Sequence, residues 1–167
     1  DRTIMLNLES GNFAKFPQTE TGIIIDKKSQ IPRSFLFEKE VSGAYLFQHF
    51  NLLANKMSRP ISSTLQLSNL AKKKKGYKSL IAQKLLERSA SLIASQIAGI
   101  YYFKKQPGLK FVMEGSLFWK GWKYKQIVQQ YLGKLNVPKN AITFIKIKNS
   151  SLLGAARLLI TQKVIQN

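Results

Sequence analysis

Two long stretches of the chain have the apolar periodicity of helices. After Pro32, apolar side chains recur every three or four residues, which predicts a helix with one buried stripe as far as Met57. A longer helical pattern runs from Ser79 to Lys104 and ends before Pro107. The stripe side chains are Leu36, Phe37, Val41, Ala44, Tyr45 and Phe47 in the first helix, and Leu80, Ile81, Leu85, Leu92, Ile93, Ile97 and Ile100 in the second.

Shorter apolar runs predict strands between further helices. Residues 59–70 contain Pro60 and several Ser, Thr and Asn residues, so they are predicted to form a loop. From Ser79 onward helices and strands alternate, which predicts a mostly parallel sheet with helices packed on its faces. The predicted strands are Thr3–Leu8, Gly22–Asp26, Leu109–Met113 and Ala141–Ile147, and the further helices are Tyr124–Leu135 and Ser151–Val164.

Polar stretches follow three of the predicted strands. They are Glu9–Phe13, Glu114–Lys120 and Lys148–Gly154. Because ligands of such sheets bind at the carboxyl ends of the strands, we expect one site to be built from all three stretches.

The composition is that of a folded globule. The chain has 167 residues, which is enough for one domain with its own core, and 44% of them are hydrophobic. No apolar run approaches the roughly 20 residues that span a bilayer. The absence of cysteine excludes disulfides and thiolate metal sites. Because residue 1 is Asp rather than Met, we expect the chain to begin inside a longer reading frame, so the lack of a targeting signal has little weight.

The formal net charge of +19 raises the question of an anionic partner. Most of the lysines are scattered, and the one long run, Lys72 to Lys75, is followed by Gly76, Tyr77 and Lys78. No recognised nucleic-acid-binding motif surrounds this run. A solvated basic loop is therefore the favoured interpretation, with some positive charge available to face the phosphates of a nucleotide.

One segment carries a family resemblance. Its residues follow, in order and spacing, the pattern S-x-N-P-G-x-x-x-F-E-K-x-x-S-G-x-Y of eukaryotic-type hexokinases. Ile31 and Arg33 stand where the family has the Asn and the Gly on either side of the Pro. The matching residues are Ser29, Pro32, Leu36, Phe37, Glu38, Lys39, Val41, Ser42, Gly43 and Tyr45. The chain thus resembles the large lobe of such a sugar kinase from Leu6 to about Ile160. In this family the segment near Gly22–Asp26 is more helical than the strand that the apolar run predicts here.

The resemblance implies a sugar site formed by two glutamates, Glu9 and Glu38. An ionised carboxylate has two acceptor oxygens, so it can accept hydrogen bonds from neighbouring hydroxyls of a hexose. The surroundings depart from the family pattern: Ser10 replaces a Trp and Phe35 replaces a Gln. These departures leave open which hexose is preferred.

The resemblance also implies a nucleotide side. The turn at Glu114 resembles the Asp-Gly-Ser/Thr turn that contacts ATP, and the segment before Gly154 resembles a second, glycine-rich loop near the adenosine, with its acidic pair replaced by Lys148 and Asn149. Ser68 is a weaker candidate for a nucleotide contact. The residues assigned to this side are Gly43, Gly115, Ser116, Ser150 and Ser151.

As a whole, the resemblance implies an α/β fold of the ribonuclease H-like type shared by actin and the hexokinases, with a mixed sheet and helices on both faces. Residues 1–167 would form a single domain, the C-terminal part of the large lobe, acting in the cytoplasm with the remainder of the hexokinase chain. The partners would be glucose or a similar hexose, phosphorylated at its 6-hydroxyl, with ATP and Mg²⁺ as cofactors.

We expect no catalytic residue and no metal ligand in this segment. Asp1 and Asp26 are the only aspartates, and neither has the neighbours of the family's general base. His49 is interpreted as a surface or packing residue. The segment alone is therefore expected to have little or no kinase activity.

Two other functions remain open. A degenerate kinase-like module would bind sugar or nucleotide without turnover, as the altered loop at Ser150–Gly154 suggests. A basic nucleic-acid-binding protein would bind through Lys72–Lys78, or stack bases on Phe118, Trp119 and Trp122. The second is less favoured, because the Gly-Ser turn fits the kinase pattern.

Overall fold

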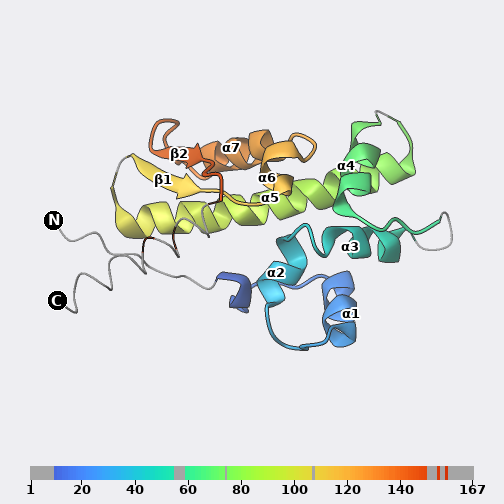
Figure 1. Ribbon diagram of the computed structural model, residues 1–167. Helices are drawn as coiled ribbons and strands as arrows, with labels where there is room; N and C mark the ends of the chain where they lie inside the picture. Colours follow the sequence, from blue (N-terminus) through green and yellow to red (C-terminus); the bar gives the residue numbers. More distant parts are fainter. Residues whose placement is uncertain are drawn as a thin grey trace.

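The computed structural model describes residues 10–54, 59–73, 75–106 and 108–149, together with Gly154 and Arg157. Figure 1 shows how the elements are arranged. In chain order they are η1 (Ser10–Asn12), α1 (Glu20–Lys28), α2 (Leu36–Val41), α3 (Leu46–Leu53), α4 (Thr64–Lys72), α5 (Tyr77–Lys104), β1 (Leu109–Val112), α6 (Ser116–Lys120), α7 (Tyr124–Lys134) and β2 (Ile142–Ile145).

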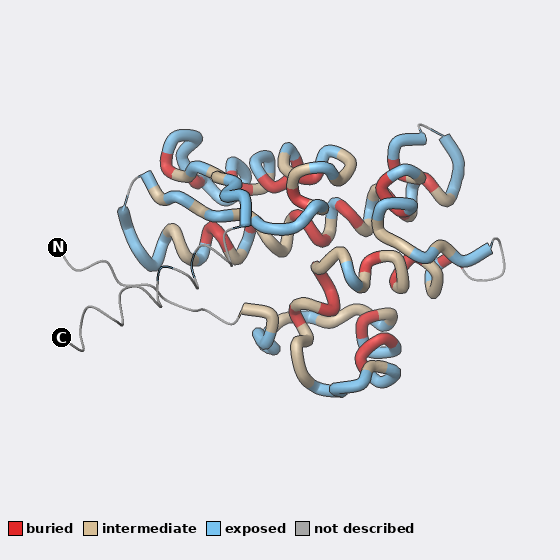
Figure 2. Tube along the Cα trace, viewed as in Figure 1, coloured by how far each residue is buried: buried red, intermediate tan, exposed pale blue. Residues whose placement is uncertain are grey.

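Helix α5 is the central element. Its 28 residues extend over about 42 Å, and α2, α3, α4 and α7 all pack against it. The face of α5 that meets these helices carries mostly small side chains, including Ala82, Ala90 and Ala94, which are fully buried. Small residues let the neighbouring helices approach closely, and the core follows this face along most of α5 (Figure 2).

The two strands pair in parallel, with Leu109 opposite Ile142 and Val112 opposite Ile145. Helices α6 and α7 connect them, and Phe118 of α6 contacts the ring of Phe144 with centroids 5.0 Å apart. The predicted order of helix, strand, helix and strand from Ser79 onward is thus confirmed. The larger mixed sheet stays a prediction, because the predicted strand Thr3–Leu8 and the predicted helix 151–164 lie outside the described residues, apart from Gly154 and Arg157.

The predicted strand Gly22–Asp26 is wrong, since these residues lie within α1. Thr19 caps the helix by accepting a hydrogen bond from the Gly22 N–H at 2.9 Å, and acidic and basic residues occupy its first and last turns. Capping and packing outweigh the strand propensity of the three isoleucines, of which only Ile25 is buried.

The helix predicted from Pro32 to Met57 is two helices, α2 and α3. Ser42 ends α2 in an extended conformation (ψ 152°), and its N–H donates to the Glu38 carbonyl. Gly43 therefore lies in a break rather than inside a helix. The last part of the prediction, residues 55–58, lies outside the described residues.

The predicted loop over residues 59–70 is also partly wrong, because α4 begins at Thr64. The polar residues that suggested a loop include its cap, in which the Ser63 Oγ accepts from the Gln66 N–H at 3.3 Å. Leu67 and Ala71 are buried against α5 and stabilise the helix. In the described part of the chain, no helix has the length and apolarity that crossing a bilayer requires.

Candidate functional site

Glu38 lies in the first turn of α2, beside the η1 turn. A Cβ atom built on Gly11 would be 3.3 Å from the Glu38 Oε2. The backbone of Phe35, which starts α2 in a left-handed conformation (φ 53°), donates its N–H to the Asn12 Oδ1 at 3.0 Å. Glu38 is therefore held next to the turn that follows Glu9 in the sequence. Glu9 itself lies outside the described residues.

Lys39 and Glu40, two neighbouring charged residues of α2, hold this helix through buried ion pairs, the first of which is that of Lys39. Lys39 is buried, and its Nζ lies 2.6 Å from the Asp26 Oδ1 and also donates to the Ser29 Oγ and the Ile31 carbonyl. Burial by itself raises the pKa of the Asp26 carboxyl. Hydrogen bonds from Lys39 and the Arg33 N–H, with the positive charges of both residues, outweigh burial and hold that pKa below its usual value. Asp26 is thus a structural carboxylate.

Glu40 of α2 is fully buried, and its carboxylate lies against the start of α1. Its Oε1 accepts from the Thr19 N–H at 2.7 Å, and its Oε2 lies 2.6 Å from the Arg88 Nη1 of α5. The carboxylate also lies over Gly22, where a Cβ atom would be only 2.1 Å from the Oε1. Sequence reasoning missed Glu40 and the ion pair at Asp26, because neither has a local sequence signal.

His49 was interpreted from the sequence as a surface or packing residue, and the structure makes it a packing residue. It is buried, and its Nε2–H donates to the Lys39 carbonyl at 2.8 Å, since a carbonyl can only accept. Its Nδ1 therefore accepts from the Thr21 hydroxyl at 2.7 Å. Burial lowers the pKa of the imidazole, so the ring is neutral at pH 7.

This histidine predicts a loss of stability in mild acid. The unfolded state takes up a proton near the ordinary pKa of 6.5, whereas the folded state does so only at lower pH. The unfolded state thus binds more protons below pH 6.5, and the free energy of unfolding should fall by up to about 1.4 kcal/mol per pH unit. Urea unfolding at pH 5.5, 6.5 and 7.5 measures this slope. His49→Gln should remove it, because His49 is the only histidine; an unchanged slope in the variant would contradict the assignment.

Three of the five residues assigned to the nucleotide side, Gly43, Gly115 and Ser116, lie around the break after α2. Gly43, Ser116 and Leu117 line two adjoining hollows of ≈ 450 and ≈ 490 Å³. Gly115 borders the first hollow with a φ of 85°, a left-handed conformation that favours glycine. Ser63, Thr64, Ser68 and Lys120 border the second hollow.

The break itself is held by two hydrogen bonds. The Thr64 hydroxyl donates to the Gly43 carbonyl at 2.6 Å, which ties the start of α4 to the break. The Ser89 hydroxyl of α5 donates to the Val41 carbonyl at 2.7 Å and accepts from the buried Tyr124 hydroxyl at 2.6 Å. The nearest side-chain atom to a Cβ built on Gly43 is the Leu117 Cβ at 3.7 Å, an ordinary contact, so none of the described residues approaches the Gly43 backbone closely.

Ser89→Ala should be more destabilising than Tyr124→Phe. Removing the serine hydroxyl leaves two buried groups, the Val41 carbonyl and the Tyr124 hydroxyl, without their partner, at a cost of about 1–3 kcal/mol. Tyr124→Phe leaves the bond to Val41 intact and should cost about 1 kcal/mol. Denaturant unfolding of both variants makes the comparison, and equal losses would show that the Val41 bond contributes little.

The aromatic residues near Ser116 are not an open platform for bases. Phe118 is buried, and Trp119 and Trp122 pack against the core. The Trp119 Nε1–H donates to the Met113 carbonyl at 2.8 Å. Ser68 is also buried, and its hydroxyl accepts from the Trp122 N–H at 2.8 Å. These contacts disfavour the base-stacking interpretation and give Ser68 a structural role.

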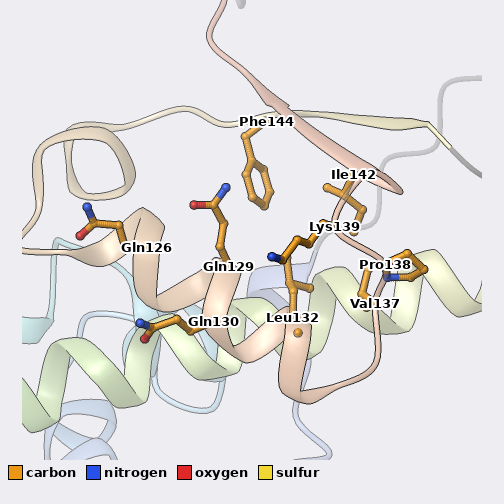
Figure 3. A pocket seen from close by; sticks show the side chains of 10 residues that line it. Gln126, Gln129, Gln130, Leu132, Val137, Pro138, Lys139, Ile142 and Phe144 are labelled. Carbon is orange, nitrogen blue, oxygen red and sulfur yellow. The ribbon is translucent and has the colours of Figure 1, made fainter.

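The remaining predicted nucleotide residues and one further hollow lie outside the site described above. Ser150 and Ser151 lie outside the described residues. A separate hollow of ≈ 530 Å³ between α7 and β2, lined by Gln126, Gln129, Gln130 and an apolar floor, includes none of the predicted site residues (Figure 3). Within the described ranges, no group of histidine and acidic side chains is arranged to hold a metal ion.

Comparison with family models and with solved structures finds hexokinases in both cases. The family model described as Hexokinase matches residues 1–77 and, in an overlapping segment, residues 54–161. A solved structure titled "Crystal structure of Hexokinase" matches with a TM-score of 0.72 and 22% identity over 86% of this chain. A hexokinase from Schistosoma mansoni, complexed with glucose, matches with a TM-score of 0.71 and 19% identity over 84% of this chain.

The chain spans 41% and 42% of the lengths of these two structures. At such identities they show the fold alone. A comparison with curated protein sequences finds no match.

Proposed function

Because this chain belongs to the hexokinase family, we propose that it supplies the sugar-binding glutamates and part of the ATP site of a kinase that phosphorylates the 6-hydroxyl of a hexose in the cytoplasm. Glucose is the first candidate, since one of the similar structures is complexed with it. Glu9 and Glu38 would accept hydrogen bonds from sugar hydroxyls and fix the hexose in one orientation.

The observation that carries the proposal is the position of α2. Glu38 lies in its first turn, and Gly43 lies two residues after its last residue, Val41. The helical rise from Glu38 to Val41 is about 4.5 Å. A side chain suited to a sugar and the hollows bordered by Gly43 and Ser116 thus lie at opposite ends of one short helix.

The residues around the second hollow suit a nucleotide. The hydroxyl of Ser116 and the ammonium of Lys120 can donate hydrogen bonds, and Gly115, at the first hollow, lets the backbone turn tightly. Ser150 and Ser151 would contribute from the C-terminal side. Bound ATP, arriving as its Mg²⁺ complex, would supply the phosphoryl group. The contribution of this chain is to bind and orient.

The general base would come from the remainder of the enzyme. Residues 1–167 would then act as a single domain of a longer kinase, which agrees with their covering about two fifths of the similar structures. Asp26 is engaged by Lys39 and the Arg33 N–H, and the buried His49 has hydrogen bonds at both ring nitrogens. Neither group is available to take a proton from a sugar hydroxyl.

Glu38→Ala tests the proposal. The chain within its full reading frame is assayed for ATP-dependent glucose phosphorylation, and glucose binding is measured by calorimetry. Loss of charged hydrogen bonds to sugar should weaken glucose binding roughly 10- to 100-fold, since each is worth about 1.5–3 kcal/mol. The thermal midpoint should change little, because Glu38 is only half-buried.

The alternative function gives a different result. Phe35 occupies the place of a family glutamine beside Asn12, which favours a degenerate module. A folded protein that binds glucose through Glu38 but forms no glucose 6-phosphate would support that module. Failure of both binding and turnover would contradict the sugar-kinase proposal.

A further inference from the structure

The turn between α4 and α5 carries an exposed group of lysines. Helix α4 ends at Lys72 and α5 begins at Tyr77, so the turn forms the tip of a helical hairpin at one end of α5 (Figure 1). Lys72, Lys73 and Lys75 are exposed and Lys78 is half-buried. These four lysines are called the tip lysines below.

The tip is held in place by side-chain caps. The buried Ser79 hydroxyl donates to the Lys73 carbonyl, and the Gln83 Nε2 donates to the Ala71 carbonyl at 2.9 Å. The last carbonyls of α4 are therefore capped by α5. The described lysines on either side of Lys74 are thus attached to helix ends that are tied to each other, which reduces the entropy lost when they meet a partner.

Two large apolar side chains accompany the lysines. Tyr77 is 58% exposed and Leu80 is 49% exposed. They are three residues apart on α5 and thus lie on the same face, followed one turn later by the exposed Lys84. The tip therefore combines ammonium groups with an aromatic and an aliphatic side chain.

No acidic residue offsets this charge along the sequence. Between Glu40 and Glu87 the chain contains no Asp or Glu. The lysines near the tip in this stretch are Lys72, Lys73, Lys74, Lys75, Lys78 and Lys84. A positive field of this kind attracts an anionic partner, and more strongly at low salt.

We propose that the α4–α5 tip docks the protein on an anionic lipid surface. The tip lysines would meet the phosphate and carboxylate groups of the lipid headgroups, and Tyr77 and Leu80 would reach the boundary of the acyl chains. Lysine suits this role because its long apolar stem lies along the interface while its ammonium stays hydrated.

Nucleic acid is the less suitable partner. Single-stranded nucleic acid is bound by aromatic rings that stack on bases along a basic groove. At the tip the one exposed ring is Tyr77, whereas Phe118, Trp119 and Trp122 belong to α6 and the turn after it and pack against the core. The pairing of lysines with Leu80 favours lipid.

Docking at the tip would use none of the residues assigned to sugar or nucleotide binding. Tyr77 and Ser89, which binds the break before Gly43, are twelve residues apart on α5, or about 18 Å of helical rise. Ser68, at the edge of the second hollow, is four residues before Lys72 on α4, or about 6 Å of helical rise. Because the two sets of residues are separate, the failure of lipid docking would leave the proposed function untouched.

Sedimentation with vesicles tests the proposal on the full chain. The vesicles contain phosphatidylcholine alone or a mixture with phosphatidylserine, at about 0.1 M and about 0.5 M salt. The tip variant replaces Lys72, Lys73, Lys75 and Lys78 by Gln. The matched control replaces four exposed lysines elsewhere, Lys110, Lys134, Lys139 and Lys148, by Gln. Both variants have the same formal charge, 19 − 4 = +15.

The expected result is binding to the mixed vesicles that weakens at high salt. Because each lysine near an anionic surface contributes about 1 kcal/mol, or roughly fivefold, the tip variant should lose at least tenfold in partitioning and the control much less. Tyr77→Ser with Leu80→Ser should lose several-fold even at high salt. Equal losses in the tip variant and the control would overturn the proposal, because charge alone would then explain binding. Binding of an oligonucleotide through the same lysines, without binding to vesicles, would overturn it in favour of nucleic acid.

Discussion

Arg88→Met is expected to lower the free energy of unfolding by about 3–5 kcal/mol. The substitution removes the guanidinium that pairs with Glu40 at 2.6 Å and leaves a fully buried carboxylate without its cation. The Thr19 N–H and hydroxyl still contact that carboxylate, but neither neutralises its charge. Methionine retains helix propensity and an apolar stem, so the loss would report the ion pair itself. Denaturant unfolding measures it.

The two partners of this pair should differ in their effects. The Arg88 side chain keeps 32% of its exposure, so it can turn to water when Glu40 is removed, whereas Glu40 is 0% exposed. Glu40→Gln should therefore cost less than Arg88→Met, and adding it to Arg88→Met should recover part of the loss. Lys84→Met, four residues earlier on the exposed face of α5, is the control and should change stability by less than about 0.5 kcal/mol. A similar loss in the control would show that the effect is not specific to the pair.

The sequence predicted the elements whose signals lie within the element itself or directly beside it. Helix α5 has a continuous apolar pattern and a clear end before Pro107, and β1, α7 and β2 follow in the predicted order. Each of these elements buries one face, and this burial produces the apolar periodicity from which the element was predicted. The break between α2 and α3 escaped this reasoning because apolar residues continue through it. At the end of α2 the Val41 carbonyl accepts a hydrogen bond from Ser89, 48 residues away in the chain, and such a partner has no local sequence signal.

The residues of the candidate site also divide into those that a sequence motif indicated and those that depend on distant partners. Glu38, Gly43, Gly115 and Ser116 were assigned to the site through the family resemblance, and their roles stay predictions; Gly43, Gly115 and Ser116 border the two adjoining hollows. The charges that hold α2 were missed. Lys39 and Glu40 look like surface residues in sequence, yet both are buried, because their partners Asp26 and Arg88 come from α1 and α5. Pairing at such separations has no local pattern, so only a three-dimensional arrangement reveals it.

Lys39→Met is expected to cost about 3 kcal/mol of stability. It removes the ammonium from the Asp26 carboxylate, which keeps 12% of its side-chain exposure and can be only partly rehydrated. The expected loss therefore lies at the low end for breaking a buried pair. The double variant Asp26→Leu with Lys39→Met replaces both charges by apolar groups and should lose much less than Lys39→Met alone. A double variant as unstable as the sum of the single variants would show that the two side chains act independently.

The Lys39–Asp26 pair should also affect how the free energy of unfolding changes with pH in acid. The folded pKa of Asp26 is lowered from 3.8, so the unfolded state binds its proton first as the pH falls. The stability contributed by the pair is complete above pH 3.8 and is lost below it, a window separate from that of His49, which begins at pH 6.5. The double variant should therefore lose the contribution of Asp26 below pH 3.8 and keep the step below pH 6.5, whereas His49→Gln should lose the step below pH 6.5 and keep the contribution of Asp26. Because α2 carries Glu38 in its first turn, weaker sugar binding by Lys39→Met at neutral pH would connect this buried pair to the orientation of Glu38, the carboxylate that we propose binds the sugar.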